Sequence, residues 1–149
     1  MTDCIHLLRE PIQHILRDFA YLDLEVLPGY CQFHSDWALA SAVECSGRCR
    51  VSVAVLMNLN LGIRTADGML GIESSFRQQV DVLGELANVL AGNAYEILCD
   101  GLRPNAVSTP KILTPHLASM IWNGSPGEFR YLLRDGETIE GGLVIAFES

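Results

Sequence analysis

Two polar residues on an otherwise apolar helical segment, Glu85 and Asn88, are the strongest candidates for chemistry in this sequence. They are three positions apart, so in a helix their side chains lie about 60° apart around the axis and project from one surface. A carboxylate accepts hydrogen bonds, whereas a carboxamide donates and accepts them and carries no charge. The spacing alone is also typical of an ordinary solvated helix face, and periodicity does not decide between the two interpretations.

A helix expected over residues 75–98 must position this pair. Its buried stripe has the i, i+3, i+4, i+7 spacing and comprises Leu83, Leu86, Ala87, Leu90, Ala94, Ile97 and Leu98. Asp81, four residues before Glu85, and Gly92, four residues after Asn88, continue the polar side of the helix. At position 92, alanine would stabilise a helix by about 1 kcal/mol relative to glycine. Glycine leaves this surface bare, so the backbone of another molecule can come close.

The N-terminal part of the chain is expected to contain a helix followed by strands. Apolar residues recur at helical spacing over residues 3–22 and comprise Leu7, Leu8, Ile12, Ile15, Leu16, Phe19 and Leu22. Because proline is tolerated in the first turn of a helix, the regular helix is expected to begin at Pro11. A short strand around Leu24 and a turn at 26–30 follow, and residues 37–57 indicate a hairpin around Ser46-Gly47-Arg48.

A short, glycine-weakened helix is expected at 59–71, and the chain after the long helix has the pattern of strands. These strands cover residues 106–113, 116–122, 128–134 and 142–148, with turns at NGSPG (123–127) and DGET (135–138). Strands joined by short turns pair in antiparallel fashion. The sequence therefore predicts a single α+β domain over residues 1–149, with two long helices packed on a mainly antiparallel sheet.

Composition limits the classes of partner. The 149 residues are 49% hydrophobic and 19% charged, as in a globular chain. Ten Lys and Arg residues against 18 Asp and Glu residues give a net charge of −8, which argues against nucleic acid or an anionic membrane surface as the main partner. The apolar stretch 51–63 is shorter than the roughly 18 residues that a membrane-spanning helix needs.

The cysteines and histidines form no recognisable ligand set. Five cysteines are scattered along a chain whose N-terminus does not resemble a signal peptide, so they are expected to be reduced thiols in a cytoplasmic protein. Cys45 and Cys49 flank the expected hairpin turn, where cross-strand packing is favoured over a metal or redox pair because no second ligand pair follows. His6 and His14 lack an acidic third ligand. No metal site is expected in this chain.

The run DVLGELANVLAGNA (81–94) resembles the central helix of the CheC/CheX/FliY chemotaxis phosphatases. The signature of that family is Asp or Ser, three residues, Glu, two residues, Asn, and a proline about 22 positions later. Here these residues are Asp81, Glu85, Asn88 and Pro110. The run 85–94 is closest to the CheX branch, and residues 10–29 and 66–71 resemble its opening helix and the short helix before the signature. The resemblance covers nearly the whole chain and implies a CheC-like fold.

The resemblance implies a phosphatase (a hydrolase) that acts on the aspartyl phosphate of a CheY-like response regulator in chemotaxis or another two-component pathway. The regulator already holds Mg²⁺ and a lysine beside the phosphate, so hydrolysis lacks only a well-placed water. Asn88 would orient that water, and Glu85 would pair with the lysine. Asp81, Gly92 and Pro110 would contact the partner. The domain itself would bind no cofactor, and the Mg²⁺ would belong to the regulator.

The resemblance also implies a homodimer with a single site on each chain. CheX-type proteins are dimers that extend their sheets across the two-fold axis, so a homodimer through the strand-rich C-terminal half is expected. CheC-type members carry a second Glu-x-x-Asn on the first helix, whereas this chain has Glu10 and Gln13 with Pro11 between them, which favours a single site. Pro110 also has a structural interpretation, because proline on an edge strand stops pairing.

An alternative function belongs to a different class. The same fold could serve as a non-catalytic module that docks a response regulator or a flagellar switch component. An intact Glu85 and Asn88 pair favours the enzyme over the module.

Overall fold

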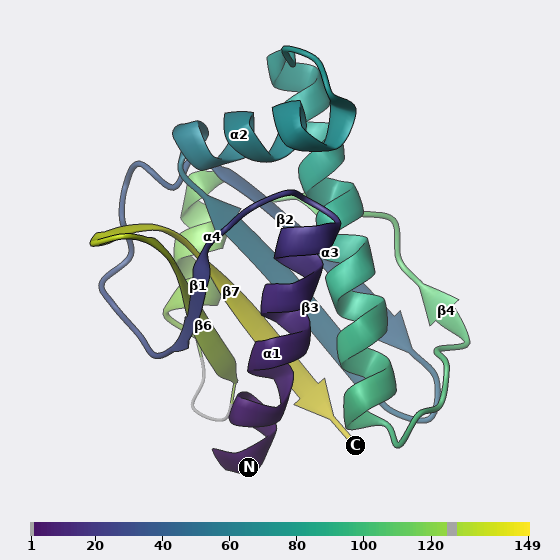
Figure 1. Cartoon of the computed structure of the whole chain (residues 1–149). Helices are drawn as coiled ribbons and strands as arrows, with labels where there is room; N and C mark the ends of the chain where they lie inside the picture. Colours follow the sequence, from purple (N-terminus) through teal and green to yellow (C-terminus); the bar gives the residue numbers. More distant parts are fainter. Residues whose placement is uncertain (1, 125–127) are drawn as a thin grey trace.

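Two long helices cover one face of a sheet in the computed structural model, which describes residues 2–124 and 128–149 (Figure 1). These helices are α1 (Thr2–Asp18) and α3 (Phe76–Leu98), and they lie side by side. The shorter helix α2 (Leu59–Leu70) packs against α3, and α4 (Pro115–Trp122) lies on the opposite face of the sheet.

The sheet has seven strands within the described residues, in the order β1-β6-β7-β3-β2-β4, and β5 also pairs with β2. The strands are β1 (Glu25–Pro28), β2 (Leu39–Ser46), β3 (Arg50–Met57), β4 (Ala106–Val107), β5 (Lys111–Ile112), β6 (Phe129–Asp135) and β7 (Thr138–Glu148). Each of their pairings is antiparallel. The expected α+β class with a mainly antiparallel sheet and two long helices is confirmed.

The sheet separates two apolar cores because successive strand residues point to opposite faces. On β3, Val53 and Val55 face the core under α1 and α3, which also buries Leu86 and Leu90 of α3. The alternate residue Leu56 faces the core under α4, which contains Trp37, Trp122, Ala118 and Val144. Central strand β3 is thus buried on both sides, and the long helices are held on one face of a well-packed support.

Helix α3 begins and ends where its sequence predicts. Ser75 is the N-cap: its hydroxyl accepts a hydrogen bond from the Gln78 amide (3.2 Å), while the Gln78 side chain accepts one from the Ser75 amide (2.9 Å). This capping box satisfies two amides that a helix otherwise leaves without partners. At the other end Asp100 and Gly101 have positive φ values of 54° and 80°, which stop the helix. The hairpin β2–β3 and the helix α2 also match their expected ranges.

Two expectations about helices are wrong. Helix α1 begins at Thr2 rather than at Pro11, and Pro11 lies inside it. A proline in a helix interior costs about 3 kcal/mol, but Leu8 on one side of it and Ile12 and Leu16 on the other are all buried in the same core, which holds both halves in line.

The second error concerns residues 116–122, which form helix α4 and not a strand. The Thr114 hydroxyl accepts a hydrogen bond from the Leu117 amide (3.3 Å), and Pro115 occupies the first turn, so the two residues start a helix. The expected strand 106–113 is only the two short strands β4 and β5. The turn at 135–138 is present, with Gly136 at φ 60°, whereas the turn at 123–127 falls partly outside the described residues.

The expectation of five reduced cysteines is also wrong, because Cys49 and Cys99 form a disulfide with their Cα atoms 6.7 Å apart. Cys4, Cys31 and Cys45 are free. The fold brings the β2–β3 turn against the end of α3, and a separation of 50 residues in the chain gives no local sign of that contact. Among the described residues, no helix combines the length and the apolar character that crossing a membrane requires.

Candidate functional site

The side chains of Asp81, Glu85 and Asn88 are exposed along one side of α3. The spacing of three and four residues places them above one another on the helix surface. Within residues 2–124 and 128–149, the side chains of Glu85 and Asn88 form no hydrogen bond and no ion pair with another residue. The carboxylate and the carboxamide are therefore both available to another molecule.

The helix beneath this surface is firmly supported. Leu83, Leu86 and Leu90 face the sheet and are almost completely buried. Fully burying a leucine side chain contributes about 1.5–3 kcal/mol, so rotation of the helix about its axis would be costly. Because the capping box also holds its first turn, the helix backbone that carries Glu85 and Asn88 is held in place.

Pro110 lies against this helix, next to the polar pair. A Cβ atom added at Gly84 would be 2.8 Å from Pro110 Cβ, so the loop between β4 and β5 packs directly on the helix backbone. The loop is tied to β2 through Ser108, whose hydroxyl accepts a hydrogen bond from the Glu44 amide (2.9 Å) and whose amide donates to the Glu44 carbonyl (2.8 Å). The structure thus brings Pro110 to the side of α3 that carries Glu85.

Gly92 lies one turn beyond Asn88 on α3. Apart from the helix's own backbone, no atom of the described residues lies within 4 Å of the Cβ that another residue would place there. The predicted site residues therefore gather in one region: Asp81, Glu85, Asn88 and Gly92 follow the helix, and Pro110 borders it at Gly84.

The side chain of Gln13 on α1 differs from Asn88 in what it contacts. Its Oε1 accepts a hydrogen bond from the Val26 amide (3.3 Å), and the Arg9 Nε donates to the Val26 carbonyl (2.7 Å). Both backbone groups belong to β1 at the edge of the sheet. Arg9 and Gln13 thus take the place of a neighbouring strand, a role that the sequence did not reveal.

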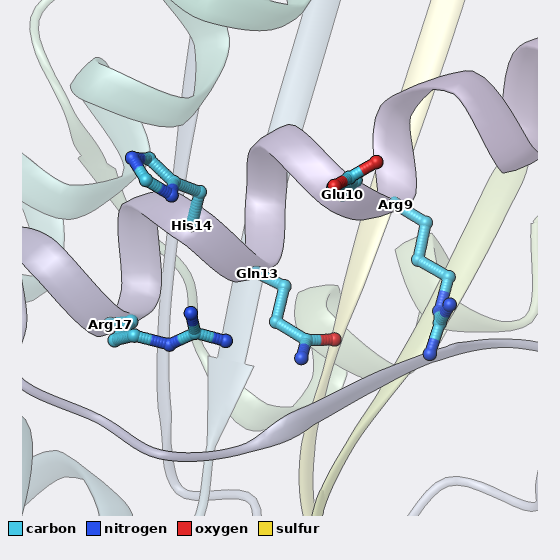
Figure 2. Close-up of a pocket in the computed structure, with 5 residues that line it drawn as sticks. All are labelled: Arg9, Glu10, Gln13, His14 and Arg17. Atoms are coloured by element: carbon cyan, nitrogen blue, oxygen red, sulfur yellow. The ribbon is translucent and has the colours of Figure 1, made fainter.

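A surface hollow of about 390 Å³ lies beside this region of α1 and is lined by Arg9, Glu10, Gln13, His14 and Arg17. Figure 2 shows Arg9, Gln13 and Arg17 extended to one side of the helix, whereas Glu10 points elsewhere. His14 is paired with Asp18 (2.8 Å). The carboxamide and carboxylate of Gln13 and Glu10 are therefore not presented together as those of Asn88 and Glu85 are.

No group of three or more His, Cys, Asp or Glu side chains in the described part of the chain is arranged to hold a metal ion. The site on α3 accordingly consists of hydrogen-bonding side chains and bare helix surface. Such a surface can bind and orient groups of a partner.

Neither a family model nor a curated protein sequence matches this chain. Solved structures do match it over almost its full length. The chemotaxis protein CheX from Vibrio vulnificus has a TM-score of 0.71 at 16% identity, and the match covers 98% of this chain and 99% of that one. A CheC-like superfamily protein from Shewanella sp. PV-4 has a TM-score of 0.73 at 16% identity, covering 100% and 99% of the two chains.

A third match is a complex of CheX with CheY, BeF3 and Mg²⁺ from Borrelia burgdorferi. Its TM-score is 0.71 at 15% identity, and the match covers 99% of this chain and 97% of that one. At identities this low, the agreement is one of architecture, and it extends over the helices and the sheet that position Glu85 and Asn88. The chain therefore has the fold of the CheX and CheC-like chemotaxis proteins.

Proposed function

We propose that this protein is a phosphatase that accelerates hydrolysis of the aspartyl phosphate of a CheY-like response regulator. The observation that carries the proposal is the exposed Glu85 and Asn88 pair, held on a rigid helix of a CheX-like fold. A structural neighbour with this fold is a CheX bound to CheY.

Asn88 contributes by positioning a water molecule. Its carboxamide both donates and accepts hydrogen bonds, and it has no charge that would repel the phosphoryl oxygens. Held in line with the phosphorus, the water attacks while the regulator's own Mg²⁺ and lysine neutralise the developing charge. Positioning of this kind lowers the barrier without a nucleophile or a metal on this chain.

Glu85 contributes by pairing with the lysine beside the phosphate. It lies one turn before Asn88 on the same exposed side, so one docking event brings both side chains into the regulator's site. The ion pair fixes the register of the two proteins and therefore the position of the Asn88 carboxamide. Asp81, Gly92 and Pro110 border the pair and contact the surrounding surface of the regulator.

The proposal also includes the compartment, the pathway, the oligomeric state and the source of the Mg²⁺. The protein acts in the cytoplasm, where response regulators are phosphorylated, in chemotaxis or a related two-component pathway. It acts as a homodimer through strands of its C-terminal half. It binds no cofactor of its own, and the Mg²⁺ is that of the regulator.

The decay of a phosphorylated response regulator tests the proposal. A regulator from the same genome is phosphorylated with a small-molecule phosphodonor, the donor is removed, and decay is followed with substoichiometric amounts of this protein. Release of many phosphates per molecule of protein supports catalysis. If decay is unchanged, or changes only when the two proteins are equimolar, the phosphatase proposal fails and the non-catalytic docking module takes its place.

A further inference from the structure

The disulfide between Cys49 and Cys99 joins two segments that are distant in the sequence. Cys49 lies in the turn between β2 and β3, and Cys99 is the residue at which α3 ends. The Cα separation of 6.7 Å falls inside the range that disulfides span, about 4.4–6.8 Å. The bond therefore connects the C-terminal end of the helix that carries Glu85 and Asn88 to the sheet beneath it.

Hydrogen bonds hold the two segments together independently of the sulfur atoms. The Tyr95 hydroxyl on α3 accepts a hydrogen bond from the Cys49 amide in the turn (3.4 Å), and within the helix end the Tyr95 carbonyl accepts one from the Cys99 amide (2.9 Å). The Ser46 carbonyl, at the start of the same turn, accepts a hydrogen bond from the Asn105 amide (2.8 Å). The fold thus brings the two cysteines to each other through contacts that do not require the disulfide.

The two sulfur atoms have different surroundings. Cys49 is partly exposed between Arg48 and Arg50 in the sequence, and it lines two surface hollows of about 250 Å³ and 510 Å³. The Arg50 guanidinium forms ion pairs with Glu44 and Glu148, whereas Arg48 forms no ion pair with a residue of the described ranges.

Cys99 has the opposite setting. Cys99 is only 7% exposed, so a small molecule reaches its sulfur less easily than that of the partly exposed Cys49. Cys45, four residues before Cys49, is fully buried, and burial followed by the charge of Glu44 raises the pKa of its thiol. Cys49 is therefore the side chain suited to attack and Cys99 the one suited to resolve.

We propose that Cys49 and Cys99 are a redox-active pair that a low-molecular-weight disulfide closes and a low-molecular-weight thiol opens. In closure, the Cys49 thiolate attacks one sulfur of the small disulfide, whose S–S bond breaks and releases one thiolate that takes up a proton. The Cys99 thiol then loses its proton and attacks the Cys49 sulfur of the mixed disulfide, which releases the second small thiol. Two protein thiols are oxidised and one small disulfide is reduced to two thiols.

Closure should stabilise the end of α3. A cross-link between residues 50 positions apart removes conformational freedom from the unfolded chain. In the open form the last turn of α3 is held by hydrogen bonds and apolar packing without the cross-link, so it should unfold locally more often. The proposal does not depend on the phosphatase activity, because each of its readouts is made without a response regulator.

The test is a thiol count of the whole protein across glutathione buffers of stepped oxidised-to-reduced ratio. After acid quenching and unfolding, a maleimide labels the remaining thiols, which mass spectrometry counts. We expect all five cysteines to be labelled in reducing buffer and three in oxidising buffer. The oxidised form should melt about 5–15 °C higher, and amides in the last turn of α3 should exchange more slowly in it.

Matched variants separate this pair from the other cysteines. Cys31→Ser should lose one label in both buffers and keep the transition, whereas Cys49→Ser and Cys99→Ser should lose the transition. Cys49→Ser should also block capture of glutathione in oxidising buffer, while Cys99→Ser should retain glutathione at Cys49. Five labels at every ratio, persistent glutathione on the wild-type protein, or equal melting of the two forms would overturn the proposal.

Discussion

Gly84 lies against Pro110, whereas Gly92, two turns further along α3, has no neighbour among the residues that the structure describes. A Cβ atom at position 84 would be 2.8 Å from Pro110 Cβ, and one at position 92 would have no described atom within 4 Å outside its own helix backbone. Glycine at 84 is thus required by packing inside this protein. Glycine at 92 has no such internal cause, and its bare surface is explained if a partner approaches there.

This difference predicts opposite effects of the same substitution. Gly92→Ala should raise the melting temperature by about 2–4 °C, because alanine favours a helix by about 1 kcal/mol. The added methyl group should also weaken binding of the response regulator, because it keeps the partner's surface further from the helix backbone. Gly84→Ala, the control, should lower the melting temperature, because the loop at Pro110 must move. Calorimetry and binding titrations measure both effects, and unchanged affinity of Gly92→Ala would show that the partner does not contact position 92.

Asn88→Ala should lower the catalytic rate steeply and leave affinity for the regulator nearly unchanged. Oriented water matters in the transition state more than in docking, so the loss should appear in kcat rather than in KM. Stability should change by no more than about 0.5 kcal/mol, because the position is exposed and alanine favours helix. Saturation curves and melting temperatures measure these quantities.

Asn93→Ala is the matched control for this substitution. Asn93 is exposed on the same helix, and its side chain donates to the Val89 carbonyl (2.8 Å) rather than facing the same way as Asn88. We expect Asn93→Ala to retain the full rate. A folded Asn88→Ala protein that also retained the full rate would end the water-positioning proposal.

Glu85→Ala should weaken binding and slow hydrolysis together, because an ion pair with the regulator's lysine contributes to both steps. Raised salt should reduce the affinity of the wild-type protein more than that of the variant, since salt screens the pair. Glu96→Ala, which removes an exposed carboxylate further along α3, should have neither effect. If the two variants behaved alike, the loss would reflect overall charge rather than a specific partner for Glu85.

A homodimer should form through the sheet edge made by β4 and β5. At the other edge, the side chains of Arg9 and Gln13 form hydrogen bonds with the backbone of β1. Val107 of β4 and Ile112 of β5 are exposed. Light scattering at micromolar concentration should give twice the mass of the chain. Ile112→Glu should shift the protein toward monomer, and Ile72→Glu, at an exposed position outside the sheet, should not. A monomeric wild-type protein would contradict the prediction.

The purified protein should contain no stoichiometric metal, while hydrolysis of the phosphorylated regulator should require Mg²⁺. The cation is that of the regulator's acidic site, and no cluster of ligands in the described residues competes for it. Elemental analysis checks the first statement, and decay measured with and without chelator checks the second. Stoichiometric zinc or iron in the purified chain would contradict the assignment.

The elements that follow from local rules were predictable. Ser75 and Gln78 specify the start of α3, and its apolar stripe specifies which side is buried, so the exposure of Glu85 and Asn88 follows from the sequence alone. Segment 116–122 was not predictable in the same way. An apolar run of that length fits a buried strand or a buried helix equally well, and Thr114 and Pro115 decide between them only at its first turn.

The sequence by itself determined the α+β class, the two long helices and the side of α3 that carries the polar pair, because these depend on residue spacings within single elements. Only the tertiary structure decided that Pro110 packs on Gly84, that Arg9 and Gln13 cover the edge of β1, and that Cys49 meets Cys99. Each of these contacts joins segments that are remote in the chain. The packing of helices on the sheet brings them together, and no spacing within a single element encodes that packing.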